Sequence, residues 1–355
     1  MADRQLGFHE TEGNADAVGT TGNALPSSTA ESETLDDRIV AHLLPERPAR
    51  AHKGTFGKLL VIAGSLDYAG AALLVCRAAG RAGAGLVTLA VPESLQPLFA
   101  AKVVEATTMA LPEDDVEEVD PDPALARILD HEHDAIVLGP GLRPGLATRE
   151  LVRRLLDTNA EPTSAPIVLD AEALRSMATL GEWWTGSRRK AIVTPHPGEF
   201  AGLRAGEGGP SADGDLVADD AARIGAARDA AVRWGQVVVL KGAKTVIADP
   251  DGRVSVAPFE NPALATGGTG DVLAGVVGAL LAQGLSPSRA ARVGVYLHGM
   301  AGDIVRERLG DAGLLASDLC EALPIARKRL TVIAERDRGG KRLGFVVRAS
   351  ATVES

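Results

Sequence analysis

The stretch "NPALATGGTGD", residues 261–271, is the most informative part of the chain for both the fold and the site. It is a glycine-rich loop that leads directly into the apolar segment "VLAGVVGALLAQG". Gly267, Gly268 and Gly270 allow the backbone to approach a ligand closely and to adopt conformations that other residues avoid. The unpaired N–H groups and the positive dipole end of a following helix would face this loop and stabilise an anion. With Thr269, these glycines form a predicted anion hole for a phosphate or a transferring phosphoryl group.

Asp271 follows this loop, at the predicted start of the helix. A carboxylate at this position can simply cap the helix, which would be a structural role. A carboxylate beside an anion hole also suits a general base that removes a proton from a hydroxyl attacking a phosphoryl group. The residues therefore indicate phosphoryl-transfer chemistry, and both roles of Asp271 remain open.

Short apolar segments alternate with helical ones along most of the chain. The strand candidates are "KLLVIAG", "GLVTLAV", "AIVLGPG", "APIVLDA", "KAIVTPH" and "QVVVLKG". They lack polar–apolar alternation, as expected for parallel strands that are buried on both faces. "TVIADPDGRVSVAP" instead predicts a β-hairpin with Asp-Gly at its turn. The pattern predicts an α/β fold with a mostly parallel sheet between helices.

Several strand candidates end in small or polar residues. Gly141 ends one candidate, Asp170 ends a second, His196 and Glu199 end a third, and Lys241 ends a fourth. Taken singly, each has a structural explanation as a turn, a helix cap or a solvated lysine. Ligands of open parallel sheets bind beyond the carboxyl ends of the strands, so together these residues favour one shared crevice.

Composition excludes some classes of function. The chain of 355 residues has a net charge of −10, which argues against a nucleic-acid-binding protein with a basic face but leaves room for a local anion site. Cys76 and Cys320 form no metal or redox motif, so we expect reduced thiols buried in helices of a cytoplasmic protein. No secretory segment is evident, and no run approaches the roughly 20 apolar residues that cross a bilayer.

Composition also divides the chain into three regions. Residues 1–34 are polar and aperiodic, which predicts a disordered tail. Residues 35–330 carry the alternating pattern and are the predicted catalytic domain. Residues 331–355 are charged and lack a clear pattern, so we expect a C-terminal appendage.

Other motifs point away from familiar nucleotide sites. "GTFGK" lacks the Ser or Thr after Lys58 and the spacing of a Walker loop. No G-x-G-x-x-G fingerprint follows the first strand candidate, so a Rossmann dehydrogenase is disfavoured. "DHEHD", residues 130–134, directly precedes a strand candidate and is expected to be a solvated loop at the opposite edge of the sheet.

"ATGGTGD" resembles the anion hole and base of the ribokinase-like superfamily, and further motifs narrow the resemblance. These motifs occur in the order seen in the NAD(P)H-hydrate dehydratases: "HKGTFGKLLVIAGS", "YAGAALLVCRAAGRAGAGLVTLAVPE", "GPGL", "VLDAEAL", "VTPHPGEFAGL", "VVLKGAKTVIADPDG", "NPALATGGTGDVLAGVVGALLAQG" and "VYLHGMAGD". The resemblance covers roughly residues 38–330. It implies a ribokinase-like three-layer α/β/α sandwich with a mostly parallel central sheet.

The resemblance also implies an activity. Family members dehydrate the S epimers of the hydrated cofactors NADHX and NADPHX to NADH and NADPH. Bacterial members cleave ADP to AMP and phosphate in this reaction, whereas eukaryotic ones use ATP, and a Mg²⁺ ion would assist the nucleotide. The sequence favours neither nucleotide, neither hydrate, and no particular metal ligands.

Particular residues acquire roles from the resemblance. Asp271 would be the base and would contact the hydrate, which Ala71, Gly141 and His196 would also hold. The residues expected to bind the nucleotide are Lys241, Gly242, Ala243, Lys244, Thr245 and Gly270. The chain departs from the family's common N-P-G-M at Ala263 and Leu264, and from a common proline at Ala69. Neither departure removes a charged group, so both concern local loop shape.

The resemblance finally implies partners and alternatives. Family members are commonly homotetramers, and we expect the epimerase that many relatives carry to be a separate chain, because a tail of 34 residues is too short for it. One alternative is a small-molecule kinase of the same superfamily, which would release a stable phosphorylated product. Another is a non-catalytic nucleotide sensor, which would be expected to lose Asp271 or the glycines.

Overall fold

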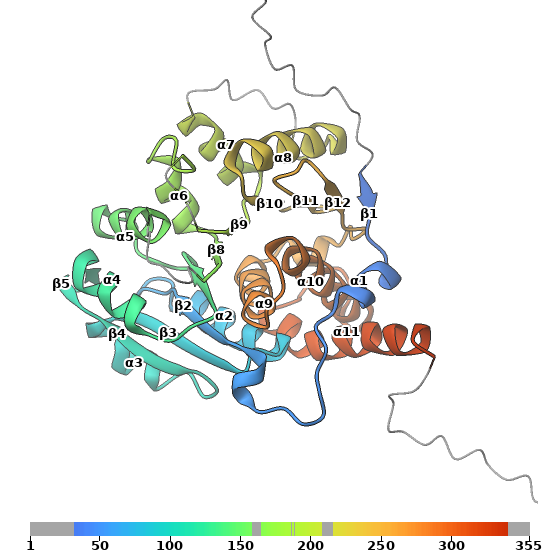
Figure 1. The fold of residues 1–355 in the computed structure, drawn as a ribbon, viewed down its shortest axis with the longest axis horizontal. Coiled ribbons are helices and arrows are strands. Elements are labelled where there is room, and N and C mark those ends of the chain that lie inside the picture. The colour runs from blue at the N-terminus through green and yellow to red at the C-terminus, as the bar shows by residue number, and fades with distance from the viewer. Residues whose placement is uncertain (1–31, 158–164, 186, 188, 208–215, 340–355) are drawn as a thin grey trace, which may run out of the picture. The chain divides into compact units, whose positions relative to one another are not determined.

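The middle layer of the computed structural model is a ten-stranded sheet with the strand order β1-β12-β11-β10-β9-β8-β7-β2-β3-β4 (Figure 1). The structure describes residues 32–157, 165–185, 187, 189–207 and 216–339. The strands of the sheet are β1 (Glu33–Thr34), β2 (Lys58–Ile62), β3 (Leu86–Pro92), β4 (Thr107–Leu111), β7 (Ala135–Leu138), β8 (Ile167–Leu169), β9 (Ala191–Val193), β10 (Val237–Leu240), β11 (Val246–Ala248) and β12 (Val254–Val256). A separate antiparallel hairpin consists of β5 (Glu113–Asp115) and β6 (Glu118–Val119).

Strand direction follows the sequence pattern closely. The strands from β4 through β3, β2, β7, β8 and β9 to β10 pair in parallel, so their carboxyl ends meet at one edge. β11 pairs antiparallel with β10 and with β12, which confirms the hairpin predicted at Asp-Gly. All six apolar strand candidates form strands, whereas β4 and β1 were not expected from the sequence.

Helices cover both faces of this sheet, which confirms the predicted three-layer α/β/α sandwich (Figure 1). The helices are α1 (Asp37–Leu43), α2 (Ala69–Ala82), α3 (Gln96–Ala100), α4 (Pro121–Asp130), α5 (Leu146–Asp157), α6 (Glu172–Ala178), α7 (Pro197–Gly206), α8 (Asp220–Trp234), α9 (Thr269–Ala282), α10 (Pro287–Leu309) and α11 (Ala316–Asp337), with 3₁₀ turns η1 (Lys53–Phe56), η2 (Glu93–Leu95) and η3 (Pro262–Leu264). One apolar cluster joins α1–α3 and α9–α11 to the sheet, and a second joins α4–α8 to its other face. Leu59 and Val61 of β2 belong to the first cluster, and Leu60 and Ile62 to the second, because successive side chains point to opposite faces.

Glycines bring α9 close to its neighbours. A Cβ atom at Gly275 would lie 2.4 Å from the carbonyl oxygen of Val75 in α2. A Cβ atom at Gly278 would lie 2.3 Å from the Cγ2 atom of Val137 in β7. These contacts fix the direction of α9, and with it the position of its first turn at the carboxyl edge of the sheet.

The domain extends beyond both boundaries that the sequence predicted, residues 35 and 330. Glu33 and Thr34, which sequence analysis assigned to the tail, pair in parallel with β12, and Leu35 is 1% exposed in the core. α11 continues past Leu330 to Asp337, so part of the expected appendage is helix. The rest of the predicted tail and appendage, residues 1–31 and 340–355, lies outside the described residues.

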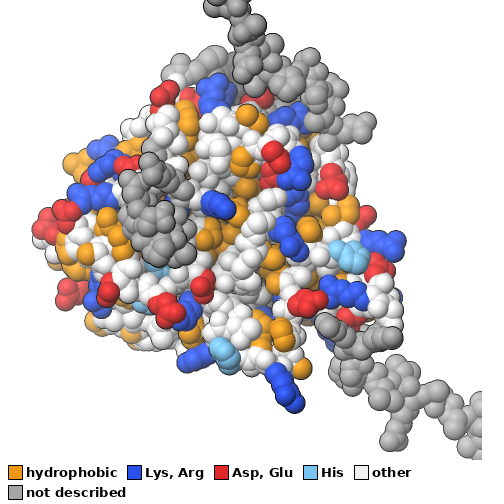
Figure 2. Space-filling view, viewed as in Figure 1, with side chains coloured by type: hydrophobic (Ala, Val, Ile, Leu, Met, Phe, Trp, Pro, Cys, Tyr) orange, Lys and Arg blue, Asp and Glu red, His pale blue; other side chains and the backbone are white. Residues whose placement is uncertain are grey.

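The two cysteines lie in helices of the core. Cys76 in α2 and Cys320 in α11 are buried free cysteines, as expected, and burial raises the pKa of Cys76 to about 12. Within the described ranges, no helix has the length and apolar character needed to cross a membrane. On the face drawn in Figure 2, basic side chains are interspersed with acidic ones.

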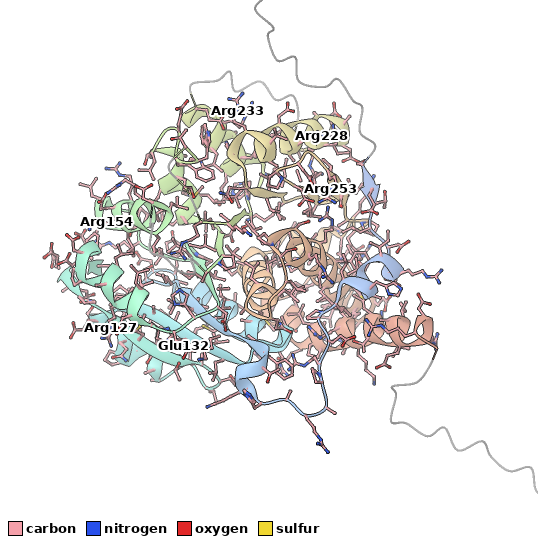
Figure 3. All side chains as sticks on the ribbon, in the orientation of Figure 1. Arg127, Glu132, Arg154, Arg228, Arg233 and Arg253 are labelled. Atoms are coloured by element: carbon pink, nitrogen blue, oxygen red, sulfur yellow. The ribbon has the colours of Figure 1, made fainter. Side chains whose placement is uncertain are left out.

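The "DHEHD" segment lies at the amino edge of the sheet, away from the carboxyl ends of the strands. Glu132, labelled in Figure 3, forms an ion pair with Lys58 at the start of β2, and its side chain is 83% exposed. The backbone N–H of Lys58 donates to Asp134 Oδ2 at 2.7 Å. The predicted position opposite the candidate site is confirmed, but the segment is only partly a solvated loop, because Asp130 ends α4 and His131 and His133 are half-buried.

Candidate active site

A buried group of opposite charges lies at the carboxyl ends of β8, β9 and β10. Lys241 Nζ donates to Asp170 Oδ1 at 2.8 Å and lies 3.6 Å from Glu199 Oε2. The side chains of Asp170 and Glu199 are 2% and 6% exposed. Burial by itself lowers the pKa of Lys241, but the charges of Asp170 and Glu199 outweigh burial and raise it overall. Lys241 is therefore a buried ammonium ion and not a solvated lysine.

Asp170 does not cap the helix that follows it. The N-cap position of α6 is Ala171, which has φ of 49° and makes no side-chain capping bond. A non-glycine residue with positive φ is strained, and such strain clusters at functional sites. The carboxylate of Asp170 is used instead by Lys241. The expected capping role is therefore absent at this strand end, where the carboxylate pairs with Lys241.

Asp271 lies beside this charged group, in the first turn of α9. The N-cap of α9 is Gly268, with φ of 90° and no side-chain capping bond, so Asp271 is not the cap. Burial, and then the charge of Asp170, raises the pKa of Asp271 to about 6, while Lys241 opposes the shift. A carboxylate that titrates close to the working pH is well suited to general-base catalysis.

The predicted anion hole surrounds these side chains. A Cβ atom at Gly270 would lie 3.6 Å from Lys241 Nζ and 4.0 Å from Asp170 Oδ2. A Cβ atom at Gly268 would lie 3.8 Å from Asp271 Oδ2, whereas one at Gly267 would meet no atom within 4 Å. The N–H of Thr269 donates to the carbonyl oxygen of Thr266 at 3.3 Å, so Gly270 is the residue of this first turn of α9 that lies beside Lys241 and Asp170 with its N–H available.

A cavity of about 490 Å³ opens next to this group. Its lining includes most of the residues predicted to bind the nucleotide or to form the anion hole, namely Lys241, Gly242, Ala243, Thr245, Thr269 and Gly270. Sequence analysis missed the remaining lining residues, which are Ala257, Phe259, Glu260, Asn261, Pro262, Leu264, Ala265, Leu273, Val295, His298 and Gly299. Apolar walls with a few polar groups are typical of pockets that bind small molecules.

Lys244, unlike the rest of "KGAKT", does not line this cavity, and neither do the predicted anion-hole residues Gly267 and Gly268. The Nζ atom of Lys244 lies 2.8 Å from Glu260 Oε1 and 3.2 Å from Asp220 Oδ2, and its side chain is 42% exposed. Its backbone has φ of 51° and its N–H donates to the carbonyl oxygen of Phe259 at 2.8 Å. Lys244 therefore shapes the loop through its backbone, while its ammonium group is paired with Asp220 and with Glu260, a carboxylate that lines the cavity.

His298 of α10 is a lining residue that holds the anion hole. Its Nε2 atom lies 2.9 Å from the carbonyl oxygen of Thr269 and donates to it, because a carbonyl can only accept. Burial lowers the pKa of His298 to about 4, so the ring is neutral at neutral pH. The motif "VYLHGMAGD" contained this residue, but no spacing in the sequence linked it to residue 269.

The residues predicted to hold the hydrate lie at neighbouring strand ends. A Cβ atom at Gly141 would lie 2.8 Å from the Cβ atom of Ala71 and 2.7 Å from the carbonyl oxygen of Tyr68. The N–H of Gly64 donates to the carbonyl oxygen of Pro140 at 2.9 Å, which joins the loops that follow β2 and β7. Gly141 and Ala71 are thus in contact, and neither lines the 490 Å³ cavity.

His196 caps α7 and is linked to the charged group through Glu199. Its Nδ1 atom accepts from the N–H of Gly198 at 3.0 Å, and Glu199 Oε2 accepts from the N–H of His196 at 3.0 Å. The same Oε2 atom lies 3.6 Å from Lys241 Nζ. The imidazole is 52% exposed, so it has a capping role and still presents an accessible edge.

Comparison with known proteins identifies relatives of the whole described domain. A family model described as NAD(P)H-hydrate dehydratase matches residues 59–325. The bifunctional NAD(P)H-hydrate repair enzyme Nnr of Moorella thermoacetica is 42% identical over 290 residues, which are 81% of this chain and 52% of the relative. The ADP-dependent (S)-NAD(P)H-hydrate dehydratase of Neisseria meningitidis is 37% identical over 298 residues, covering 82% of this chain and 91% of the relative. The chain spans about half the length of the bifunctional relatives that it matches.

Solved structures agree with these matches. The ADP/ATP-dependent NAD(P)H-hydrate dehydratase of Bacillus subtilis, co-crystallised with ATP and Mg²⁺, has 33% identity and a TM-score of 0.69, over 84% of this chain and 99% of that one. A ribokinase-like superfamily protein of Enterococcus faecalis, at 24% identity and a TM-score of 0.66 over 84% of this chain and 96% of that one, shares the fold. The predicted ribokinase-like fold is confirmed, and the chain belongs to the NAD(P)H-hydrate dehydratase family.

Proposed function

We propose that this chain is an ADP-dependent (S)-NAD(P)H-hydrate dehydratase, a lyase that restores NADH and NADPH from NADHX and NADPHX and cleaves ADP to AMP and phosphate. The observation that carries the proposal is the position of Asp271, whose pKa is raised to about 6 beside Lys241 and the first turn of α9. Lys241, Thr269 and Gly270 line the cavity, and the next residue along α9 is Asp271; a base, a cation and a glycine-rich helix start close together suit phosphoryl transfer to a hydroxyl.

The proposed first step is phosphorylation of the hydrate. Asp271 takes the proton from the ring hydroxyl, and that oxygen attacks the terminal phosphoryl group of ADP, which releases AMP. The N–H group of Gly270 would face the phosphoryl oxygens and offset their developing charge, whereas the N–H of Thr269 donates to the carbonyl oxygen of Thr266. Lys241 adds a positive charge that Asp170 and Glu199 keep in place.

The proposed second step is elimination of the phosphate ester. The lone pair of the ring nitrogen expels phosphate, and a proton leaves the adjacent ring carbon, which restores the dihydronicotinamide. Nucleotide cleavage thus drives a dehydration that water would oppose. In this arrangement ADP occupies the 490 Å³ cavity and the hydrate lies over Ala71, Gly141 and His196.

Mg²⁺ fits this site as a companion of the nucleotide. Within the part of the chain that the structure describes, no group of three or more His, Cys, Asp or Glu residues is arranged to hold a metal ion. Mg²⁺ commonly binds one or two carboxylates together with substrate phosphates and water. Asp170 and Glu199 are buried and already hold Lys241, so the ion would be held mainly by the nucleotide phosphates and water, and it would neutralise phosphate charge.

Partners and cell compartment remain part of the proposal. The S epimer must be supplied by an NAD(P)H-hydrate epimerase activity. A homotetramer, a cytoplasmic location and the absence of nucleic-acid or membrane partners are likewise predictions.

Product analysis tests the proposed function. Purified protein is mixed with NADHX, Mg²⁺ and either ADP or ATP, and the absorbance of NADH and the release of phosphate are followed together. The proposal requires NADH and inorganic phosphate in equal amounts, with AMP when ADP is used. A stable phosphorylated product without NADH would identify a small-molecule kinase instead, and no turnover of either hydrate would favour a nucleotide sensor.

A further inference from the structure

Arg223 of α8 is buried directly beneath the loop formed by residues 241–245. It is 1% exposed, whereas Arg228 and Arg233 of the same helix, both labelled in Figure 3, are half-buried and exposed. Its Nη2 atom donates to the carbonyl oxygen of Leu240 at 3.3 Å, and its Nη1 atom donates to that of Ala243. The guanidinium group therefore joins the end of β10 to the middle of the loop.

Gly242 lies between these two carbonyls and faces the guanidinium group. Its φ is 147°, and a Cβ atom there would lie 2.9 Å from Arg223 Nη2 and 3.2 Å from Arg223 Cζ. Gly242 and Ala243 also line the 490 Å³ cavity. Arg223 thus contacts one side of the backbone whose other side forms the cavity wall.

Packing alone does not explain a charged side chain at this position. Arg223 Nε has no hydrogen-bond partner among the described residues, and Asp220 Oδ1 is 3.6 Å from Nη1 on a side chain that is 52% exposed. A buried cation with an unsatisfied N–H destabilises a fold relative to an apolar side chain of similar shape. Its charge in a dry environment acts strongly on groups in the adjoining cavity.

We propose that Arg223 is a positioning residue for the nucleotide. Its two-pronged contact with Leu240 and Ala243 sets the path of the loop that receives the nucleotide, and its buried charge favours an anion in the cavity. This inference rests on the proposed function, since it assigns the cavity to ADP. Arg223 does not line the cavity, so it acts through the backbone of Gly242 and Ala243.

Arg189 is a matched control for substitution of Arg223. It is also 1% exposed, and it also donates to backbone carbonyls, from Nε to Leu155 at 3.0 Å and from Nη1 to Ala165 at 2.7 Å. It lies just before β9, at the amino edge of the sheet. Arg189→Met therefore measures how much stability is lost when a buried arginine that bonds two carbonyl oxygens is removed away from the cavity.

The experiment compares Arg223→Met, Arg223→Lys and Arg189→Met with the unsubstituted protein. Calorimetry measures the Kd of ADP, thermal unfolding measures Tm, and steady-state kinetics measures the KM of NADHX. We expect Arg223→Met to weaken ADP by about 10- to 100-fold, the range for losing hydrogen bonds of a charged group, and to change the KM of NADHX by less than about threefold. Arg223→Lys keeps the positive charge but loses the two-pronged contact with Leu240 and Ala243. Its Kd for ADP should therefore lie between those of Arg223→Met and the unsubstituted protein. Arg189→Met should lower Tm while leaving the Kd of ADP within about twofold.

The outcomes separate this inference from the proposed function. If Arg189→Met and Arg223→Met weaken ADP equally, Arg223 contributes only to folding and the inference is wrong. If Arg223→Met does not fold, the Kd of ADP for Arg223→Lys tests the inference instead. An unchanged Kd in that variant would show that the two-pronged contact with Leu240 and Ala243 does not position the nucleotide. An unsubstituted protein that binds ADP but dehydrates no hydrate overturns the proposed reaction and leaves the comparison of Kd values valid. An unsubstituted protein that binds no adenine nucleotide overturns both.

Discussion

Lys241 Nζ lies 2.8 Å from Asp170 Oδ1, and this ion pair joins the end of β10 to the end of β8 across the intervening strand β9. Both side chains are largely buried, at 19% and 2% exposure. Their separation along the chain means that neither charge finds its partner until the parallel sheet has formed. The pair is therefore a product of the fold, and each partner depends on the other for compensation of its charge.

Breaking this pair should destabilise the protein and weaken nucleotide binding. Lys241→Met leaves Asp170 buried without its cation, which typically costs roughly 3 kcal/mol or more. The double variant Lys241→Met/Asp170→Asn should recover part of the free energy of unfolding but not the affinity for ADP. Urea unfolding and calorimetric titration of ADP measure the two effects. Equal stability of the single and double variants would show that the two charges are not coupled.

Removing the carboxylate of Asp271 should abolish most turnover without preventing nucleotide binding. Asp271→Asn keeps the size of the side chain but cannot accept the proton, so we expect the rate to fall by about 10²- to 10⁴-fold. ADP binding should stay within a few-fold of the unsubstituted protein, measured by calorimetry. Near-normal turnover in this variant would remove Asp271 from the mechanism.

The raised pKa of Asp271 predicts a pH dependence of the rate. The base must be ionised, so kcat should rise with pH through about 6 and then level off. A profile of kcat between about pH 5 and 8, with saturating ADP and NADHX, measures this. A rate that is independent of pH across that window would contradict the assignment.

The same shift predicts how stability changes with pH. The pKa of Asp271 rises from 3.8 to about 6 on folding, so its stabilising contribution is complete below about 3.8 and is lost as pH rises through 6. Asp271→Asn lacks this titration. Relative to the unsubstituted protein, the variant should therefore gain free energy of unfolding, by up to about 3 kcal/mol, between pH 4 and pH 7. Chemical unfolding of both proteins at a series of pH values tests the sign.

His196 should affect both stability and the hydrate, and His52 offers a matched control. His52 Nδ1 accepts from the N–H of Gly54 at 3.1 Å, so it caps η1 much as His196 caps α7, but before β2 at the amino edge. Each substitution by alanine should cost about 1 kcal/mol, the usual contribution of a cap. His196→Ala should also raise the KM of NADHX more than that of ADP, whereas His52→Ala should change neither. If His196→Ala raises only the KM of ADP, the imidazole belongs to the nucleotide side.

The sheet and its carboxyl edge were predictable because both depend on local patterns. Runs such as "VVVL" before Lys241 identify strands buried on both faces, and parallel direction brings the residues after them together. β4 was missed because "TTMAL", residues 107–111, mixes polar and apolar residues at the edge of the sheet. β1 was missed because a strand of two residues has no pattern.

Within the site, contacts between distant segments escaped prediction. Phe259 and His298 reach the cavity from a loop after β12 and from α10, and no sequence spacing relates them to Lys241. The outward direction of Lys244 depends on φ at that residue and on two acidic partners supplied by tertiary structure. The cap at His196 had a local signal, since a polar residue followed three positions later by glutamate is typical of a capping box.

The walls of the 490 Å³ cavity come from one continuous part of the chain, between Lys241 and Gly299. Ala71, Gly141 and His196 all precede that part. A genetic crossover near the start of β10 would therefore exchange the cavity proposed for the nucleotide together with Asp271, and would leave Ala71, Gly141, His196 and Arg223 in the other part. Asp170 lies before such a crossover point and Lys241 lies after it. A recombined chain would therefore have to keep both partners of this ion pair.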